Sequence, residues 1–100
     1  MVKLIRSNPI FNPVRALVLL VDPAADSQVA GLAHDTNNNR IYITAYTANM
    51  VVRINPETND FEGSAIPVGT GPVGIIHNPN NNNIYVTNSG SNTVSYQFSD

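Results

Sequence analysis

The sequence repeats itself at a fixed spacing of 43 residues, and this regularity limits the possible folds more than any other feature. Four pairs of segments or residues share the spacing: Gly31–His34 with Gly74–His77, Asn37–Asn39 with Asn80–Asn82, Ile41–Thr44 with Ile84–Thr87, and Asn49 and Val51 with Asn92 and Val94. Because the spacing holds across all these pairs without a gap, the chain is expected to contain at least two copies of one structural unit.

Within a unit, the residue types favour short β-strands joined by tight turns. Asparagine disfavours helix interiors and tolerates the left-handed backbone that tight turns need. In residues 40–46 the side chains alternate, with Ile41 and Ile43 on one face and Tyr42 and Thr44 on the other. The strands expected in the first unit are 29–34, 40–46, 50–54 and an outer strand 61–68, and those in the second are 73–77, 84–88 and 93–98.

A repeat of about 40–45 residues built from four strands is typical of a β-propeller blade. Helical repeats of similar length need a helical periodicity that this sequence lacks. We therefore predict an all-β fold of four-stranded antiparallel blades, with about two blades in the chain. Residues 2–6 and 14–21 are expected to form the third and fourth strands of a partial blade that precedes the first unit. The predicted organisation is a partial blade and linker at 1–28, a full blade at 29–72, and a second blade without its outer strand at 73–100.

The segment Ile84-Tyr85-Val86-Thr87-Asn88 contains the pattern that names the YVTN family of propeller repeats, and its flanks at 66–72 and 88–94 agree with it. Over about residues 29–98 the chain resembles that family. The first copy, Ile41–Ala45, matches less well because alanine replaces the final asparagine. The resemblance implies a bacterial or archaeal protein of the surface-layer or exported type, usually with seven blades. This chain departs from that pattern because it encodes little more than two.

A propeller blade has two apolar faces and normally needs a neighbour on each side. Two blades would leave two broad apolar faces exposed, more than a soluble monomer tolerates. Three arrangements remain open: a fragment of a longer protein, a subunit of a larger assembly, and a closed ring of copies joined head to tail. We favour the homo-oligomeric ring, in which residues 14–21 of one copy pair with the free strand that ends at Phe98 of another.

The charge pattern excludes some partners. The chain has five basic and seven acidic residues and no basic stripe, so nucleic-acid binding is not expected. It has no cysteine, which excludes disulfides and thiolate metal sites. The longest apolar run, 16–21, is too short for a transmembrane helix, and the N-terminus does not favour a signal peptide. The compartment stays undecided, although the family resemblance suggests a cell-surface or extracellular location.

The sequence contains no recognisable catalytic motif, and we expect a non-catalytic structural or interaction module with no cofactor and no metal. His34 and His77 occupy equivalent positions in the repeat. They are the candidate channel-facing ligand contacts, although a histidine that holds the adjacent turn is the favoured interpretation. The Asp35 and Asn78 turns resemble calcium loops only superficially, because the glycine and distal glutamate are missing. Tyr42 and Tyr85, also equivalent, are expected to pack rather than to stack on a ligand.

Two alternative functions stay open at this point. One is a module that binds a small ligand or a glycan at the mouth of the channel or between blades. The other is a fragment of a propeller hydrolase or lyase, for which the two histidines are the only support in the sequence. A protein or glycan partner would suit the scaffold interpretation.

Overall fold

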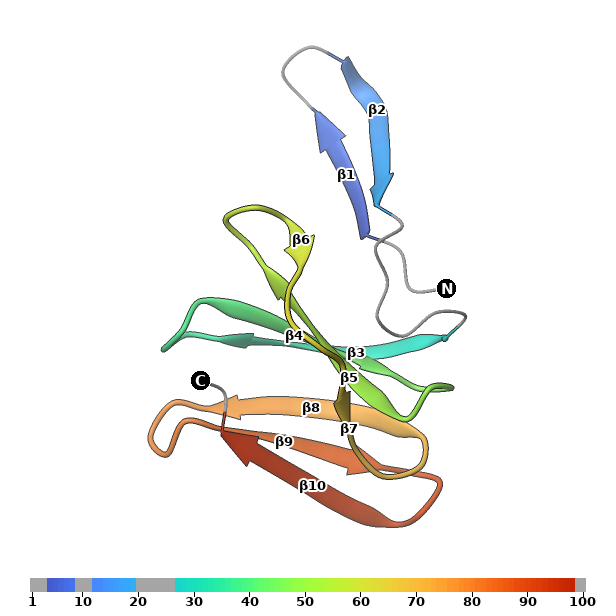
Figure 1. The fold of residues 1–100 in the computed structure, drawn as a ribbon, viewed down its shortest axis with the longest axis vertical. Helices are drawn as coiled ribbons and strands as arrows, with labels where there is room; N and C mark the ends of the chain where they lie inside the picture. Colours follow the sequence, from blue (N-terminus) through green and yellow to red (C-terminus); the bar gives the residue numbers. More distant parts are fainter. Residues whose placement is uncertain (1–3, 9–11, 20–26, 99–100) are drawn as a thin grey trace.

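The computed structural model describes residues 4–8, 12–19 and 27–98, and these residues form strands and turns arranged in three antiparallel sheets (Figure 1). The strands are β1 (Leu4–Asn8), β2 (Asn12–Leu19), β3 (Val29–Asp35), β4 (Arg40–Ala45), β5 (Met50–Asn55), β6 (Asp60–Phe61), β7 (Ile66–Pro67), β8 (Pro72–Asn78), β9 (Asn83–Asn88) and β10 (Thr93–Phe98). The all-β prediction is confirmed. We call β3–β7 the first unit and β8–β10 the second unit.

In the first unit, the strands follow the order β3-β4-β5-β6, and β7 also pairs with β5. The three inner strands agree with their predicted positions to within a residue. The continuous outer strand predicted at 61–68 is wrong, because β6 and β7 pair separately with β5. Gly63 interrupts the strand with a φ of 72°, and the Glu62 N–H donates to the Arg53 carbonyl oxygen at 2.8 Å. A left-handed glycine bends the chain away from the ladder at this point.

In the second unit, the strands lie in the order β10-β9-β8, and all three were predicted from the repeat. Within the described part of the chain, the outer edge of β10 has no strand beside it. β1 and β2 form a separate antiparallel pair, which lies at the opposite end of the molecule from β10 in Figure 1. The predicted strands 2–6 and 14–21 overlap β1 and β2, but their outer ends lie outside the described residues. The division of the chain into blades at 28 and 72 stays a prediction.

Among residues 27–98, five turns of four residues join neighbouring strands, and each one ends in an asparagine with a φ between 53° and 60°. These asparagines are Asn39, Asn49, Asn59, Asn82 and Asn92. Asparagine adopts this left-handed conformation more readily than most other residues, so the frequent asparagines of the sequence have a backbone role. Three of these turns also begin with a side chain that accepts a backbone hydrogen bond two residues later. The acceptors are Asp35, Asn55 and Asn78, at 2.9, 3.0 and 2.9 Å.

The main core lies between the two units, which stack face to face. Ala33, Tyr42 and Val51 of the first unit pack against three buried residues of the second unit, Ile75, Ile84 and Val86. Gly31 allows this close approach, because a Cβ atom at that position would collide with the Val73 carbonyl oxygen. The predicted alternation of faces in β4 is confirmed, since Tyr42 and Thr44 are fully buried on the side of the second unit.

A small polar cluster holds the segment in which the outer strand is interrupted. Glu62 accepts a hydrogen bond from Arg40 Nε at 2.6 Å and another from Asn55 Nδ2 at 3.1 Å. Arg53 Nε lies 3.7 Å from the same carboxylate. The hydrogen bond from Arg40 is the largest of the effects that lower the pKa of Glu62.

Because the pKa of Glu62 is lower in the folded chain, its contacts should stabilise the fold above the ordinary carboxyl pKa of 4.5. This contribution should be lost as the pH falls through the folded-state value. In Glu62→Gln we expect a flatter dependence of the free energy of unfolding on pH between about 3 and 6. Urea denaturation across this range measures the effect, with the exposed Glu57→Gln as the matched control. A parent-like pH dependence in Glu62→Gln would contradict the prediction.

Candidate interaction surface

We call the interface between the two units the seam. At the end of the seam near the turn that follows Asp35, it contains a buried histidine–carboxylate pair. His77 Nε2 of the second unit lies 3.0 Å from Asp35 Oδ1 of the first, and the two side chains are 2% and 0% exposed. The same Asp35 oxygen accepts the backbone N–H groups of Asn37 and Asn38 at 2.9 and 3.1 Å. These donors fix the carboxylate in the turn and compensate for its burial.

Further polar contacts cross the seam beside this pair. Asn37 Nδ2 donates to Asn82 Oδ1 and to the Pro79 carbonyl oxygen, both at 3.1 Å. Asn82 Oδ1 also lies 3.1 Å from His77 Nε2. Because this nitrogen faces an acceptor amide oxygen and a carboxylate, it carries the proton and donates it to both. The seam is therefore closed by directed hydrogen bonds as well as by apolar packing.

His34 contacts its own turn in the way that His77 does, but it is exposed. Its Nε2 lies 3.1 Å from Asn39 Oδ1, which matches the distance from His77 to Asn82. Both histidines therefore hold the asparagine-rich turns that follow their strands. The structure gives them different surroundings: His77 lies between the two units, and His34 lies on the side of the first unit away from the second. A ligand contact at either histidine stays a prediction.

The second unit leaves one apolar face uncovered. On that face Ile76, Val94 and Tyr96 are 63%, 62% and 71% exposed, and the Tyr96 ring lies 5.9 Å from the Tyr85 ring. We call these residues, with Thr87, the open face. The first unit has Ala33, Tyr42, Thr44 and Val51 at four of the equivalent positions, and there the residues are buried against the second unit. The open face is thus a second copy of a surface that this chain already uses for packing.

The two equivalent tyrosines show how different the two faces are. Burial raises the pKa of Tyr42, although a hydrogen bond with Arg53 opposes the effect. Hydrogen bonds from Asn83 and Asn81 instead lower the pKa of Tyr85. The prediction that Tyr42 serves packing is confirmed, since it lies in the core between the units.

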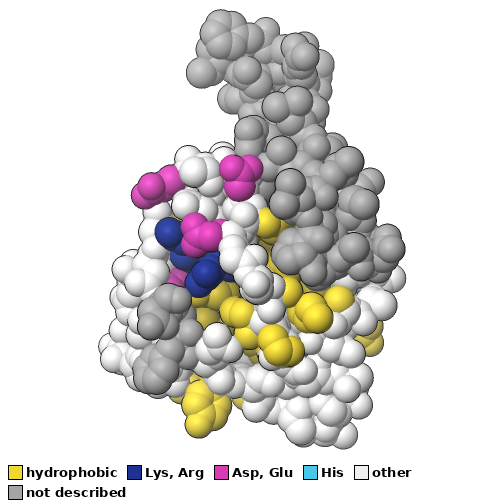
Figure 2. Space-filling view, viewed as in Figure 1, with side chains coloured by type: hydrophobic (Ala, Val, Ile, Leu, Met, Phe, Trp, Pro, Cys, Tyr) yellow, Lys and Arg dark blue, Asp and Glu magenta, His cyan; other side chains and the backbone are white. Residues whose placement is uncertain are grey.

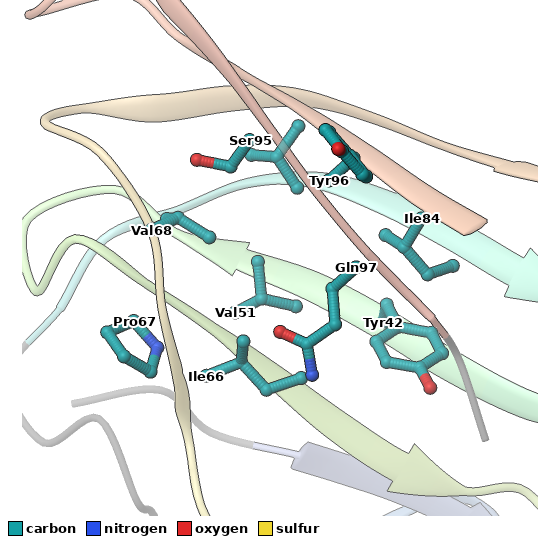
Figure 3. A pocket seen from close by; sticks show the side chains of 10 residues that line it. Tyr42, Val51, Ile66, Pro67, Val68, Ile84, Ser95, Tyr96 and Gln97 are labelled. Atoms are coloured by element: carbon teal, nitrogen blue, oxygen red, sulfur yellow. The ribbon is translucent and has the colours of Figure 1, made fainter.

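At the outer end of the seam lies an open pocket. Figure 2 shows hydrophobic side chains gathered across the middle of this side of the molecule, below a group of basic and acidic side chains. In Figure 3, Gln97 and Ser95 of β10 face Ile66 and Val51 across the pocket. The lining is mostly apolar and is completed by Tyr42, Pro67, Val68, Ile84, Val86 and Tyr96. The pocket therefore suits apolar side chains, and it lies beside the free edge of β10.

Among the described residues, no group of three or more histidine, cysteine or acidic side chains is arranged to hold a metal ion. The turns after Asp35 and Asn78 use their side-chain oxygens to accept backbone N–H groups, as the prediction of hairpin turns requires. The described residues contain no helix that is long and apolar enough to cross a membrane.

Comparison with known proteins identifies the repeat. A family model described as SBBP, a beta-propeller repeat, matches residues 18–49, a span that includes β3 and β4. The chain is also similar to a solved chain of Kuenenia stuttgartiensis hydrazine synthase, with a TM-score of 0.68 and 19% sequence identity. The alignment covers 85% of this chain and 31% of that one, so this chain spans about a third of its length. No curated protein matches. The predicted propeller blades are confirmed at the level of the fold.

The buried Asp35–His77 contact was not predicted from the sequence. One difference between the two copies of the repeat indicated it: Asp35 has a carboxylate where the equivalent residue, Asn78, has an amide. The repeat made the two histidines equivalent, but it does not show which of them has a neighbouring unit beside it.

Proposed function

We propose that this β-propeller repeat chain is a non-catalytic structural and interaction module that assembles head to tail with copies of itself into a closed ring. One observation supports this function above all. The open face has Tyr85, Thr87 and Val94 at the positions that Tyr42, Thr44 and Val51 occupy on the surface with which the first unit binds the second. A face of this kind is complementary to the surface that a further unit would bring.

The complementary surface is present on the first unit. In the second unit, Ile75 and His77 point toward the first unit and are covered by it. Their equivalents in the first unit are Leu32, which is 63% exposed, and the exposed His34. At these two positions the first unit presents the counterpart of the surface that the second unit uses in the internal seam. An interface whose two halves differ joins copies head to tail and closes into a ring when the rotation allows it.

A strand of a neighbouring copy would also cover the free edge of β10. In the first unit, β7 occupies the equivalent edge of β5, where Ile66 pairs with Val51 and packs against the core. β2 is eight residues long and pairs only with β1 among the described strands, and an isolated two-stranded sheet is marginally stable in water. Addition of β2 from another copy to β10 would remove two exposed edges.

The proposed location and partner of this module rest on the sequence motif at residues 84–88. Residues 84–88 carry the pattern of the YVTN repeats, which supports a surface-exposed scaffold of bacterial or archaeal origin with a protein or glycan partner. In this role the rigid blades would present their turns to that partner.

Native mass spectrometry and sedimentation velocity over a range of concentrations test the assembly. We expect masses that are whole multiples of the chain, with three copies giving about six blades and four copies about eight. A single monomeric species at every concentration would show that the proposal is wrong.

A further inference from the structure

The seam within the chain shows which polar groups would meet at the seam between copies. Across the internal seam, His77 donates to Asp35, and Asn37 donates to Asn82 and to the Pro79 carbonyl oxygen. When each of these residues is replaced by its equivalent in the other unit, the donor and the acceptor lie on two different copies of the chain. The groups brought together are His34 with Asn78 and Asn80 with Asn39 and the Thr36 carbonyl oxygen.

His34 is already positioned for this contact. Its Nε2 lies 3.1 Å from Asn39 Oδ1, as His77 Nε2 lies 3.1 Å from Asn82 Oδ1. The ring is therefore held by its own turn in the orientation with which His77 reaches Asp35. Because His34 is exposed in the single chain, an incoming acceptor would meet it without a rearrangement of the strand.

Asn78 is also positioned like its equivalent. Its Oδ1 accepts the Asn80 N–H at 2.9 Å, as Asp35 Oδ1 accepts the Asn37 N–H at 2.9 Å. The difference is charge, because Asn78 offers a neutral amide oxygen where Asp35 offers a carboxylate. A hydrogen bond to an ionised acceptor is roughly twice as strong as one between neutral groups.

We propose that His34 of one copy donates its Nε2–H to Asn78 Oδ1 of the next copy, and that the neutral Asn78 makes this seam weaker than the seam inside the chain. This inference rests on the proposed head-to-tail assembly and names the polar residues that determine its strength. At the same seam, Asn80 of that next copy donates to Asn39 of the first copy. The second copy is favoured as the occupant of the open face because the chain itself carries the complementary residues.

Substitution of Asn78 by aspartate tests the inference. In Asn78→Asp, the carboxylate has the same local setting as Asp35 and should bind His34 of the next copy more tightly. We expect the dissociation constant of the assembly, from sedimentation velocity, to fall about five- to tenfold. In the double variant His34→Phe, Asn78→Asp, this gain over His34→Phe alone should disappear, since phenylalanine has no N–H to donate. Circular dichroism and urea unfolding establish that each variant is folded.

The results separate the two proposals. If the parent chain does not associate at any concentration, both the assembly and this inference are wrong. If the parent associates but Asn78→Asp binds no more tightly, the assembly stands and the role of Asn78 is wrong. The inference is also wrong if the gain is the same with His34→Phe, because the added carboxylate then acts through another group.

Discussion

Replacing Asp35 by alanine will lower the free energy of unfolding by about 1.5–3 kcal/mol, the range for hydrogen bonds to a charged group. Asp35 is fully buried, and its carboxylate contacts His77 and the two backbone N–H groups of its own turn. In Asp35→Ala these donors lose the carboxylate inside the seam, where water does not easily replace it, and His77 keeps only Asn82 as an acceptor. Urea denaturation followed by circular dichroism, at one fixed protein concentration, measures the loss.

The repeat supplies the control for this experiment. Asn78→Ala removes the equivalent side chain from a turn at which the seam is open in the single chain, and only the hydrogen bond from the Asn80 N–H is lost. Under conditions where the chain is monomeric, we expect a loss of about 1 kcal/mol. Equal losses in Asp35→Ala and Asn78→Ala would show that Asp35 acts only within its turn and not across the seam.

The second large effect is expected at the open face. Ile76→Asp places a carboxylate at the centre of the surface that the next copy would cover, and its burial without a partner is costly. We expect the dissociation constant of the assembly to rise at least about a hundredfold. Because Ile76 is 63% exposed in the single chain, the fold itself should be preserved. Sedimentation velocity measures the association, and the exposed turn variant Thr58→Asp should behave like the parent.

A mixing experiment then tests the head-to-tail geometry. Leu32→Asp damages the opposite surface, on the first unit, and should also yield monomers. A mixture of Leu32→Asp and Ile76→Asp contains one undamaged pair of surfaces, so it should form a one-to-one dimer that grows no further. If the mixture stays monomeric, or if either variant alone still assembles, the surfaces of Ile76 and Leu32 do not meet between copies.

The repeat spacing predicted the inner strands of both units well. Each strand pattern occurs twice in the sequence, so the weak pattern in one copy is supported by the same pattern in the other. Ile41 and Tyr42 alternate faces in the sequence, and the structure buries Tyr42 between the units. The outer strand was harder to predict. Residues 61–68 contain enough apolar residues for one strand, and local sequence does not show that Gly63 takes a positive φ beside the Arg53 side chain.

The seam residues could not be predicted from the repeat, since a repeat shows equivalence but not surroundings. Leu32 and Ile75 are equivalent, yet one is 63% exposed and the other 9%. The difference arises because Ile75 has the first unit beside it. Asp35 and His77 are similarly far apart in sequence and meet only through the stacking of two sheets.

The five turns that end in a left-handed asparagine also allow the surface to diverge. Their geometry depends on the last residue, while the three residues before it are Thr-Asn-Asn, Tyr-Thr-Ala, Pro-Glu-Thr, Pro-Asn-Asn and Ser-Gly-Ser. Such different triplets on one backbone shape mean that, where a turn makes no contact with the other unit, its residues can change while the strands keep their register. The exposed residues of these turns can therefore diverge without a redesign of the interior.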